Sequence, residues 1–162
     1  MKFFYLLFKT LFQVYCIFIL TWYNPFSFSF FDSTVSISLD FLMLYFIVQS
    51  FFLSGVGTII LGCFLGYLID LDLETSLVGV NCFFLSVGGY LLSLVKINSS
   101  NWTDTIKYLY IWFICLILFI NKYLFYNYQF NFSDFISIAI NSLIVTVTLI
   151  AVNRFYYKGK LV

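Results

Sequence analysis

The residues of this chain that could do acid–base or metal chemistry are carboxylates gathered in one short segment. Asp70, Asp72 and Glu74 stand at alternate positions. Carboxylates this close can bind a divalent cation, and a pair of them can act as general acid and base. The chain has no histidine, and no basic residue accompanies the cluster. Because acidic loops are usually solvated, we interpret this cluster as a water-exposed loop with neither a catalytic nor a metal site.

The cysteines offer no further chemistry by their sequence pattern. Cys16, Cys63, Cys82 and Cys115 each stand alone in an apolar run, without a Cys-x-x-Cys pair. Metal sites and disulfide frameworks are recognised by close or regular spacing, which is absent here. We therefore interpret all four as small apolar side chains in lipid or at helix contacts. With no phosphate-binding glycine loop either, the sequence predicts a non-enzymatic protein without a cofactor.

The composition requires a membrane. Of the 162 residues, 63% are apolar, 24% are aromatic and only 9% are charged. An average soluble domain has roughly 25% charged residues, so this chain lacks the polar surface that a soluble protein needs. A net charge of +1 gives no electrostatic footprint for nucleic acid. We predict one integral membrane domain over residues 1–162, in contact with lipid.

Hydropathy windows of about 15–20 residues divide the chain into six apolar runs, which predict an all-α membrane protein, a compact bundle of about six transmembrane helices. The runs are Phe3–Tyr23, Leu39–Leu53, Val56–Ile69, Leu77–Val95, Ile106–Phe125 and Phe135–Tyr156. The second and third runs are short for spanning helices. They are either tilted helices in a thinned bilayer or a re-entrant hairpin, and both alternatives leave the other spans oriented alike. The connection 24–38, with repeated Phe and Ser, is expected to lie as an aromatic skirt in the outer interface.

The loop charges predict the orientation. If the N-terminus is cytoplasmic, the outer side has one basic residue, Lys122, together with six acidic residues. The basic residues of the cytoplasmic side are then Lys2, Lys9, Lys96, Lys107, Arg154, Lys158 and Lys160. Cytoplasmic loops are enriched in Lys and Arg, so both termini are predicted to be cytoplasmic and the acidic loop to face outward.

Small and polar residues indicate which helix faces pack, because membrane helices associate by close backbone approach and hydrogen bonds. The third run has a small or polar residue at every fourth position: Ser54, Thr58, Gly62, Gly66 and Asp70. The fourth run has such a stripe at Gly79, Cys82, Ser86, Gly89 and Ser93. The sixth run has one at Asp134, Ser137, Asn141, Ile144, Thr148 and Ala151. We expect these three runs to form the packed centre, and the fifth run, without a stripe, to be peripheral and lipid-facing.

Two acidic residues and one amide need partners of their own. Asp70 lies near a helix C-terminus, where the helix dipole disfavours a carboxylate. It could pair with a cation, bind a partner or ligand, cap backbone N–H groups, or reach outer water, and the sequence leaves these four open. Asp40 begins the second run, where capping of a helix N-terminus is the better explanation. Asn141 is expected to need an interhelical hydrogen bond.

Several of these residues together resemble a known family. An Asp that opens the second run (Asp40), the segment Gly62-x-x-x-Gly66-x-x-x-Asp70 and the following Gly79-x-Asn81 are similar to the rod shape-determining protein MreD. Gly88-Gly89-Tyr90 resembles another short stretch of that family, and Asn141 with a basic tail after it resembles the family's last helix. The motif content covers about residues 39–95. Leu39 stands where the family commonly has a proline.

The resemblance implies a non-enzymatic scaffold of the bacterial cell-elongation machinery. It would lie in the inner (cytoplasmic) membrane and hold the single-span coiled-coil protein MreC. The MreB filament and the RodA/penicillin-binding synthase of peptidoglycan would belong to the wider complex. The candidate packing or partner-contact residues are Asp40, Gly62, Gly66, Asp70, Gly79, Asn81, Gly89 and Asn141.

Two other functions stay open at this point. The family is also distantly similar to the substrate-binding S components of vitamin transporters, which implies an outward pocket near Asp40, Asp70 and Asn81. Such a pocket would need a volume of some hundreds of Å³. The second is a small subunit of a respiratory complex, which the Phe, Tyr and Ile usage and Gly88-Gly89 suggest.

Overall fold

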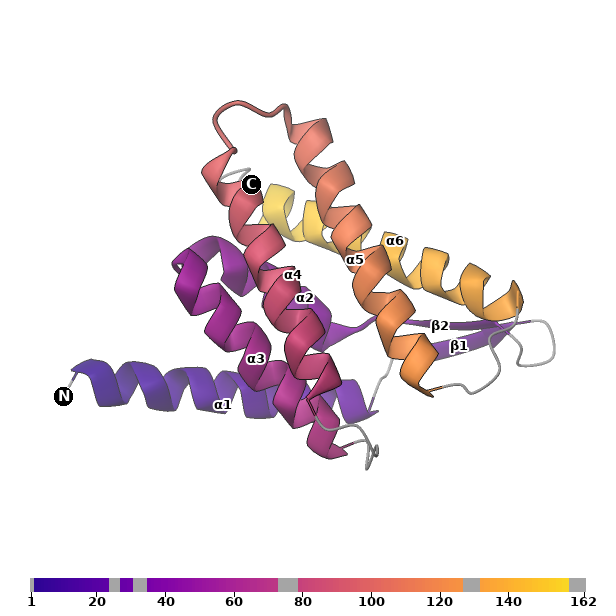
Figure 1. Cartoon of the computed structure of the whole chain (residues 1–162), viewed down its shortest axis with the longest axis horizontal. Coiled ribbons are helices and arrows are strands. Elements are labelled where there is room, and N and C mark those ends of the chain that lie inside the picture. The colour runs from indigo at the N-terminus through magenta and orange to yellow at the C-terminus, as the bar shows by residue number, and fades with distance from the viewer. Residues whose placement is uncertain (1, 24–26, 31–34, 73–78, 127–131, 158–162) are drawn as a thin grey trace.

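The structure, a computed structural model, describes residues 2–23, 27–30, 35–72, 79–126 and 132–157. This part of the chain contains six helices, whose bounds follow the six apolar runs to within a few residues. They are α1 (Lys2–Tyr23), α2 (Phe41–Phe52), α3 (Gly55–Asp72), α4 (Val80–Ile97), α5 (Asp104–Tyr126) and α6 (Phe132–Phe155). The prediction of an all-α bundle is therefore confirmed for the helices, whose arrangement is shown in Figure 1.

Three of the helices, α4, α5 and α6, are long and apolar enough to cross a membrane. The shorter apolar helical segments in the described residues are Phe8–Thr21, Phe41–Phe52 and Gly55–Leu71. At a rise of 1.5 Å per residue, the 12 residues of α2 extend only about 18 Å, against a hydrocarbon core of about 30 Å.

A β-hairpin precedes α2, where the sequence had indicated only an interfacial connection. Strand β1 (Ser27–Phe30) pairs antiparallel with β2 (Val35–Ser38), with Ser27 opposite Ser38 and Phe30 opposite Val35. Both strands alternate Ser with an apolar residue, which is the period-2 pattern of a β-strand. The hairpin lies along α6, to which β2 packs (Figure 1).

The short helix α2 lies at the centre of the fold. It packs against α1, α3, α4 and α6, and its side chains Phe46 and Ile47 are completely buried. Leu53 and Ser54 form the turn that joins α2 to α3, and the Ser54 Oγ accepts a hydrogen bond from the N–H of Gly57 (3.2 Å). The ammonium group of Lys96 on α4 also contacts this turn, because it donates a hydrogen bond to the Leu53 carbonyl (2.8 Å). The predicted centre of the third, fourth and sixth runs therefore omitted the helix that joins them.

The expectation that the fifth run is peripheral is wrong. Helix α5 packs against both α4 and α6, and its buried face is formed by Ile111, Ile114, Cys115, Leu118 and Phe119. Leu118 lies over Gly88 of α4, where a Cβ would come within 3.0 Å of the Leu118 side chain. Helix α5 thus packs through a large side chain placed over a glycine of α4, without a stripe of small residues of its own.

In the described part of the chain, α1 is the peripheral helix, because among the helices it packs only against α2. Its N-terminal end extends away from the other helices in Figure 1. Phe8, Phe12 and Tyr15 are 71%, 59% and 65% exposed, so these apolar side chains are available to lipid.

The stripe predicted on α6 is correct only in its first half. Ser137 and Asn141 are buried as expected. Thereafter the buried face continues through Ser142, Val145, Thr146 and Leu149, while Ala151 is exposed. The packed face of α6 therefore turns away from the predicted Thr148 and Ala151.

Candidate functional site

Glycines bring α3 and α4 into backbone contact. A Cβ on Gly62 would collide with the backbone of Leu85, and a Cβ on Gly66 with the backbone of Asn81 and Cys82. From the other side, a Cβ on Gly89 would come within 2.8 Å of the carbonyl oxygen of Thr58 on α3. The two predicted stripes therefore face each other, as the side-by-side course of α3 and α4 in Figure 1 illustrates.

Asp70 ends this interface by capping the N-terminus of α4. Its Oδ2 accepts hydrogen bonds from the backbone N–H of Gly79 (2.9 Å) and of Cys82 (3.2 Å). Its Oδ1 accepts from the backbone N–H (3.1 Å) and the side-chain Nδ2 (2.8 Å) of Asn81. The first N–H groups of a helix have no intrahelical partners, so a carboxylate there satisfies them and meets the positive end of the helix dipole.

Of the roles considered for Asp70, the structure shows backbone capping. The residue is only 1% exposed, so it does not simply reach outer water. Glu74 and the side chain of Asp72 lie outside the described residues. Where the structure describes His, Cys, Asp and Glu side chains, it groups no three of them around a possible metal position.

Gly79 and Asn81 act in this cap from the α4 side. Gly79 has φ +105°, a left-handed conformation that L side chains rarely adopt, although a Cβ there would meet nothing within 4 Å. The backbone conformation at this position therefore requires glycine, although there is room for a larger side chain. Asn81 is 8% exposed and offers two donors to one carboxylate oxygen. The predicted Gly79-x-Asn81 motif is thus the partner of Asp70.

Asp40 caps α2 and forms an ion pair across the fold. Its Oδ1 accepts from the Met43 N–H (3.0 Å), the hydrogen bond expected of an N-cap. Its Oδ2 lies 2.8 Å from the ammonium group of Lys122 on α5. Burial by itself would raise the pKa of Asp40, but the Lys122 charge and hydrogen bonds to Lys122 and backbone N–H groups hold it below its ordinary value of 3.8.

Asn141 joins three elements, as its expected need for a partner indicated. Its Oδ1 accepts a hydrogen bond from the backbone N–H of Ser38 in β2 (2.9 Å). Its Nδ2 lies 3.5 Å from the Tyr123 hydroxyl on α5, a weak interhelical hydrogen bond. The side chain is 1% exposed, so these contacts hold the β-hairpin and α5 against α6.

A small recess lies between the Asp40 and Asp70 caps. Its polar lining residues are Asp40, Asn81, Asn121 and Lys122, and its apolar ones are Leu42, Met43, Ile69, Phe84, Leu85 and Leu118. The cavity of about 20 Å³ has room for roughly one water molecule. Asn121 is 5% exposed, and its Oδ1 has no hydrogen-bond partner among the described residues.

Three residues of this region were not selected from the sequence. Lys122 and Asn121 sit within an aromatic helix whose spacing gave no sign of a polar partner. Cys63 was interpreted as an isolated side chain, yet its Sγ lies 2.8 Å from the Sγ of Cys82. Cys63 directly follows Gly62 of the stripe. Because the stripe predicts close approach of this part of α3 to a neighbouring helix, it was the sequence signal from which this contact could have been expected.

The candidate residues therefore fall into connected groups. Gly62, Gly66, Gly89, Asp70, Gly79 and Asn81 form the α3–α4 interface and its cap. The recess connects that cap, through Asn81, to the ion pair of Asp40. Asn141 lies in a separate contact with β2 and α5. Comparison with known proteins gives no relative: no family model, no curated protein and no solved structure matches this chain.

Proposed function

We propose that this protein is a non-enzymatic scaffold of the bacterial cell-elongation machinery, of the MreD type. It would lie in the inner membrane with both termini cytoplasmic. Its direct partner would be an MreC-like single-span coiled-coil protein, with the MreB filament and the RodA/penicillin-binding synthase in the wider complex. Lipid would cover the remaining apolar surface.

The α3–α4 interface is the observation that supports a scaffold best. The glycines, Asp70 and Asn81 of the two segments that resemble MreD, Gly62-x-x-x-Gly66-x-x-x-Asp70 and Gly79-x-Asn81, have packing or capping contacts. Gly62 and Gly66 contact the α4 backbone, and Asp70 accepts hydrogen bonds from Gly79 and Asn81. A motif whose residues are all engaged in holding two helices together fits a protein that positions others.

The exposed apolar surface of α1 supports the same function. This helix packs against α2 alone among the described helices. Exposed side chains such as Phe12 and Tyr15 leave a long apolar face on which a single-span partner helix could pack in the bilayer.

Affinity purification from mild detergent, followed by mass spectrometry, tests this function. Recovery of a single-span coiled-coil protein is the expected result. Gly66→Leu, which forces α3 away from α4, should abolish that recovery. Phe113→Leu should leave it intact, because Phe113 is 56% exposed on α5. Equal recovery with both variants would contradict the assignment of the α3–α4 interface.

The recess favours one alternative function, a small-molecule-binding membrane subunit like the S component of a vitamin transporter. Of the three side chains expected at such a site, Asp40 and Asn81 line the recess, together with Lys122, and Asp70 does not. A cavity of about 20 Å³ is far smaller than the several hundred Å³ of a typical ligand pocket. A vitamin-sized ligand would therefore require α5 to move away from α2.

The same purification separates the two functions. An ATPase module that energises transport, recovered in place of the coiled-coil protein, would favour the small-molecule function. A ligand retained through purification and lost in Lys122→Met would do the same. Recovery of neither module nor ligand would count against that alternative.

A further inference from the structure

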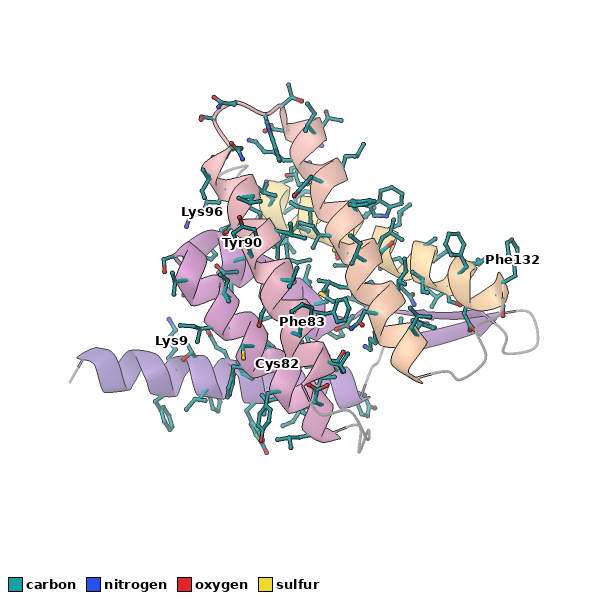
Figure 2. All side chains as sticks on the ribbon, viewed as in Figure 1. Lys9, Cys82, Phe83, Tyr90, Lys96 and Phe132 are labelled. Atoms are coloured by element: carbon teal, nitrogen blue, oxygen red, sulfur yellow. The ribbon has the colours of Figure 1, made fainter. Side chains whose placement is uncertain are left out.

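Two cysteines from neighbouring helices face each other across the α3–α4 interface. The Sγ atoms of Cys63 and Cys82 are 2.8 Å apart, whereas a disulfide bond is about 2.05 Å long. The remaining described cysteines make no such contact: Cys16 is half-buried on α1 and Cys115 is buried on α5. Figure 2 shows Cys82 beside α3, near the N-terminal end of α4.

The glycine contacts make this geometry suitable for a covalent bond. A disulfide requires Cα atoms about 4.4–6.8 Å apart, which is closer than most helix pairs approach. Gly62 precedes Cys63, and Gly66 packs directly against the backbone of Cys82. Because the backbones touch there, forming the bond requires only a small movement of the two sulfur atoms.

We propose that Cys63 and Cys82 are a redox-active thiol pair that forms an intramolecular disulfide by exchange with a small disulfide, RSSR. Cys63, the more exposed thiol, attacks RSSR as the thiolate, which forms a mixed disulfide and releases one RSH. Cys82 then attacks the Cys63 sulfur and releases the second RSH. Two protein thiols are oxidised, one RSSR is reduced to two RSH, and each leaving sulfur takes a proton that an attacking thiol lost.

The position of the pair fits this chemistry. Cys82 is the third residue of α4, within one turn of the end that Asp70 caps. In the proposed orientation this end faces the outer side, where disulfides persist. The bond would connect α3 to α4 on the face where these helices already touch. Its formation does not depend on which partner the protein binds.

The test uses the purified full chain in detergent, with oxidised glutathione as RSSR. The protein is then unfolded in denaturant so that N-ethylmaleimide reaches and blocks every free thiol, and the protease fragments are analysed by mass spectrometry without reduction. We expect a cross-linked Cys63–Cys82 fragment, blocked Cys16 and Cys115, and two equivalents of reduced glutathione. The bond should raise the thermal unfolding midpoint by roughly 5 °C or more, because it closes a loop between positions 19 apart.

The matched control moves one thiol around α3. In Cys63→Ser/Phe64→Cys the thiol stands one residue further on, about 100° around the helix, and it should not pair with Cys82. That variant also keeps a cysteine count of four, so a general effect of oxidation is held constant. The proposal is overturned if wild type forms no Cys63–Cys82 fragment, if its cross-links are between molecules, or if the shifted thiol pairs equally well.

Discussion

Asp70 is a carboxylate that this fold keeps inside an apolar interface by giving it hydrogen-bond donors. Its position at the end of α3 is unfavourable with respect to that helix's own dipole. The N-terminus of α4 lies beside it, however, and supplies three backbone N–H groups and the amide of Asn81. Charge-assisted hydrogen bonds of this kind are the strong ones, so the residue is stabilising where sequence alone made it look costly.

Replacing the carboxylate by an amide should weaken this cap. Asp70→Asn keeps the shape, but its NH₂ group cannot accept, so two of the four donors lose their partner. We expect the free energy of unfolding to fall by about 2 kcal/mol, measured by circular dichroism in mixed micelles. Asn81→Ala should cost about 1 kcal/mol, and the two costs should not add, because both residues share one hydrogen bond. Strictly additive costs would contradict the cap.

The Asp40–Lys122 ion pair predicts a dependence on acid. The pKa of Asp40 is lowered in the folded protein, so the stability that the pair contributes is present above pH 3.8 and is lost as the pH falls further. Lys122→Met removes the opposing charge and leaves burial, which raises the pKa. The unfolding midpoint at pH 7 should therefore be lower in Lys122→Met than in wild type. Between pH 7 and pH 3 the midpoint of the variant should rise relative to that of wild type, because its buried Asp40 gains stability by taking up a proton. Lys122→Arg is the control and should keep the wild-type profile.

Helix packing in this protein depends on which atoms a glycine meets. Gly66 meets backbone, which cannot move without separating α3 from α4, whereas Gly88 meets only the end of the Leu118 side chain. Both are buried glycines in apolar helices, but the sequence spacing places only Gly66 in a stripe of small residues. The structure gives the physical reason for the difference.

A pair of alanine substitutions tests this difference. Gly66→Ala should lower the free energy of unfolding by about 1–3 kcal/mol through overpacking against Asn81 and Cys82. Gly88→Ala should change it by less than about 1 kcal/mol, because Leu118 can adjust and alanine favours the helix. Unfolding of both variants in the same detergent measures the contrast. Equal losses would show that backbone contact is not what makes Gly66 necessary.

The helices themselves were predictable because apolar runs of this length have few other solutions in lipid. The facing stripes of α3 and α4 were also predictable, because rows of small residues mark the faces at which membrane helices approach each other closely. The central place of α5 was not, because its Leu118 packs into a gap that Gly88 leaves on another helix. The β-hairpin had a signal in the alternation of Ser with apolar residues, which an interpretation based on hydropathy alone overlooks.

At the scale of the whole molecule, charged side chains take part in separate local contacts. Asp40, Lys122 and the Asp70 cap lie around one recess, and Lys96 lies at the α2–α3 turn, to whose Leu53 carbonyl it donates. Exposed aromatic residues such as Phe83, Tyr90 and Phe132 point outward from α4 and α6 in Figure 2. These exposed apolar side chains suit contact with lipid.

Labelling from one side of the membrane tests the proposed orientation. In a background with all four cysteines replaced by serine, Phe132→Cys and Ser100→Cys place single thiols at exposed positions near opposite ends. A membrane-impermeant maleimide should label Phe132→Cys in intact cells. It should label Ser100→Cys only after the membrane is permeabilised, because the α4–α5 connection is proposed to be cytoplasmic. The reverse pattern would invert the orientation.

The contact between Asp70 and the start of α4 also determines how this sequence can change over evolutionary time. Gly66 meets main-chain atoms, so the identity of the side chain across from it can drift while the glycine stays. Asp70 and Asn81 join side chain to side chain, so a change in either removes the hydrogen bond between the two side chains. Related sequences should therefore show positions 70 and 81 changing together and position 66 staying glycine, whatever residues stand opposite it.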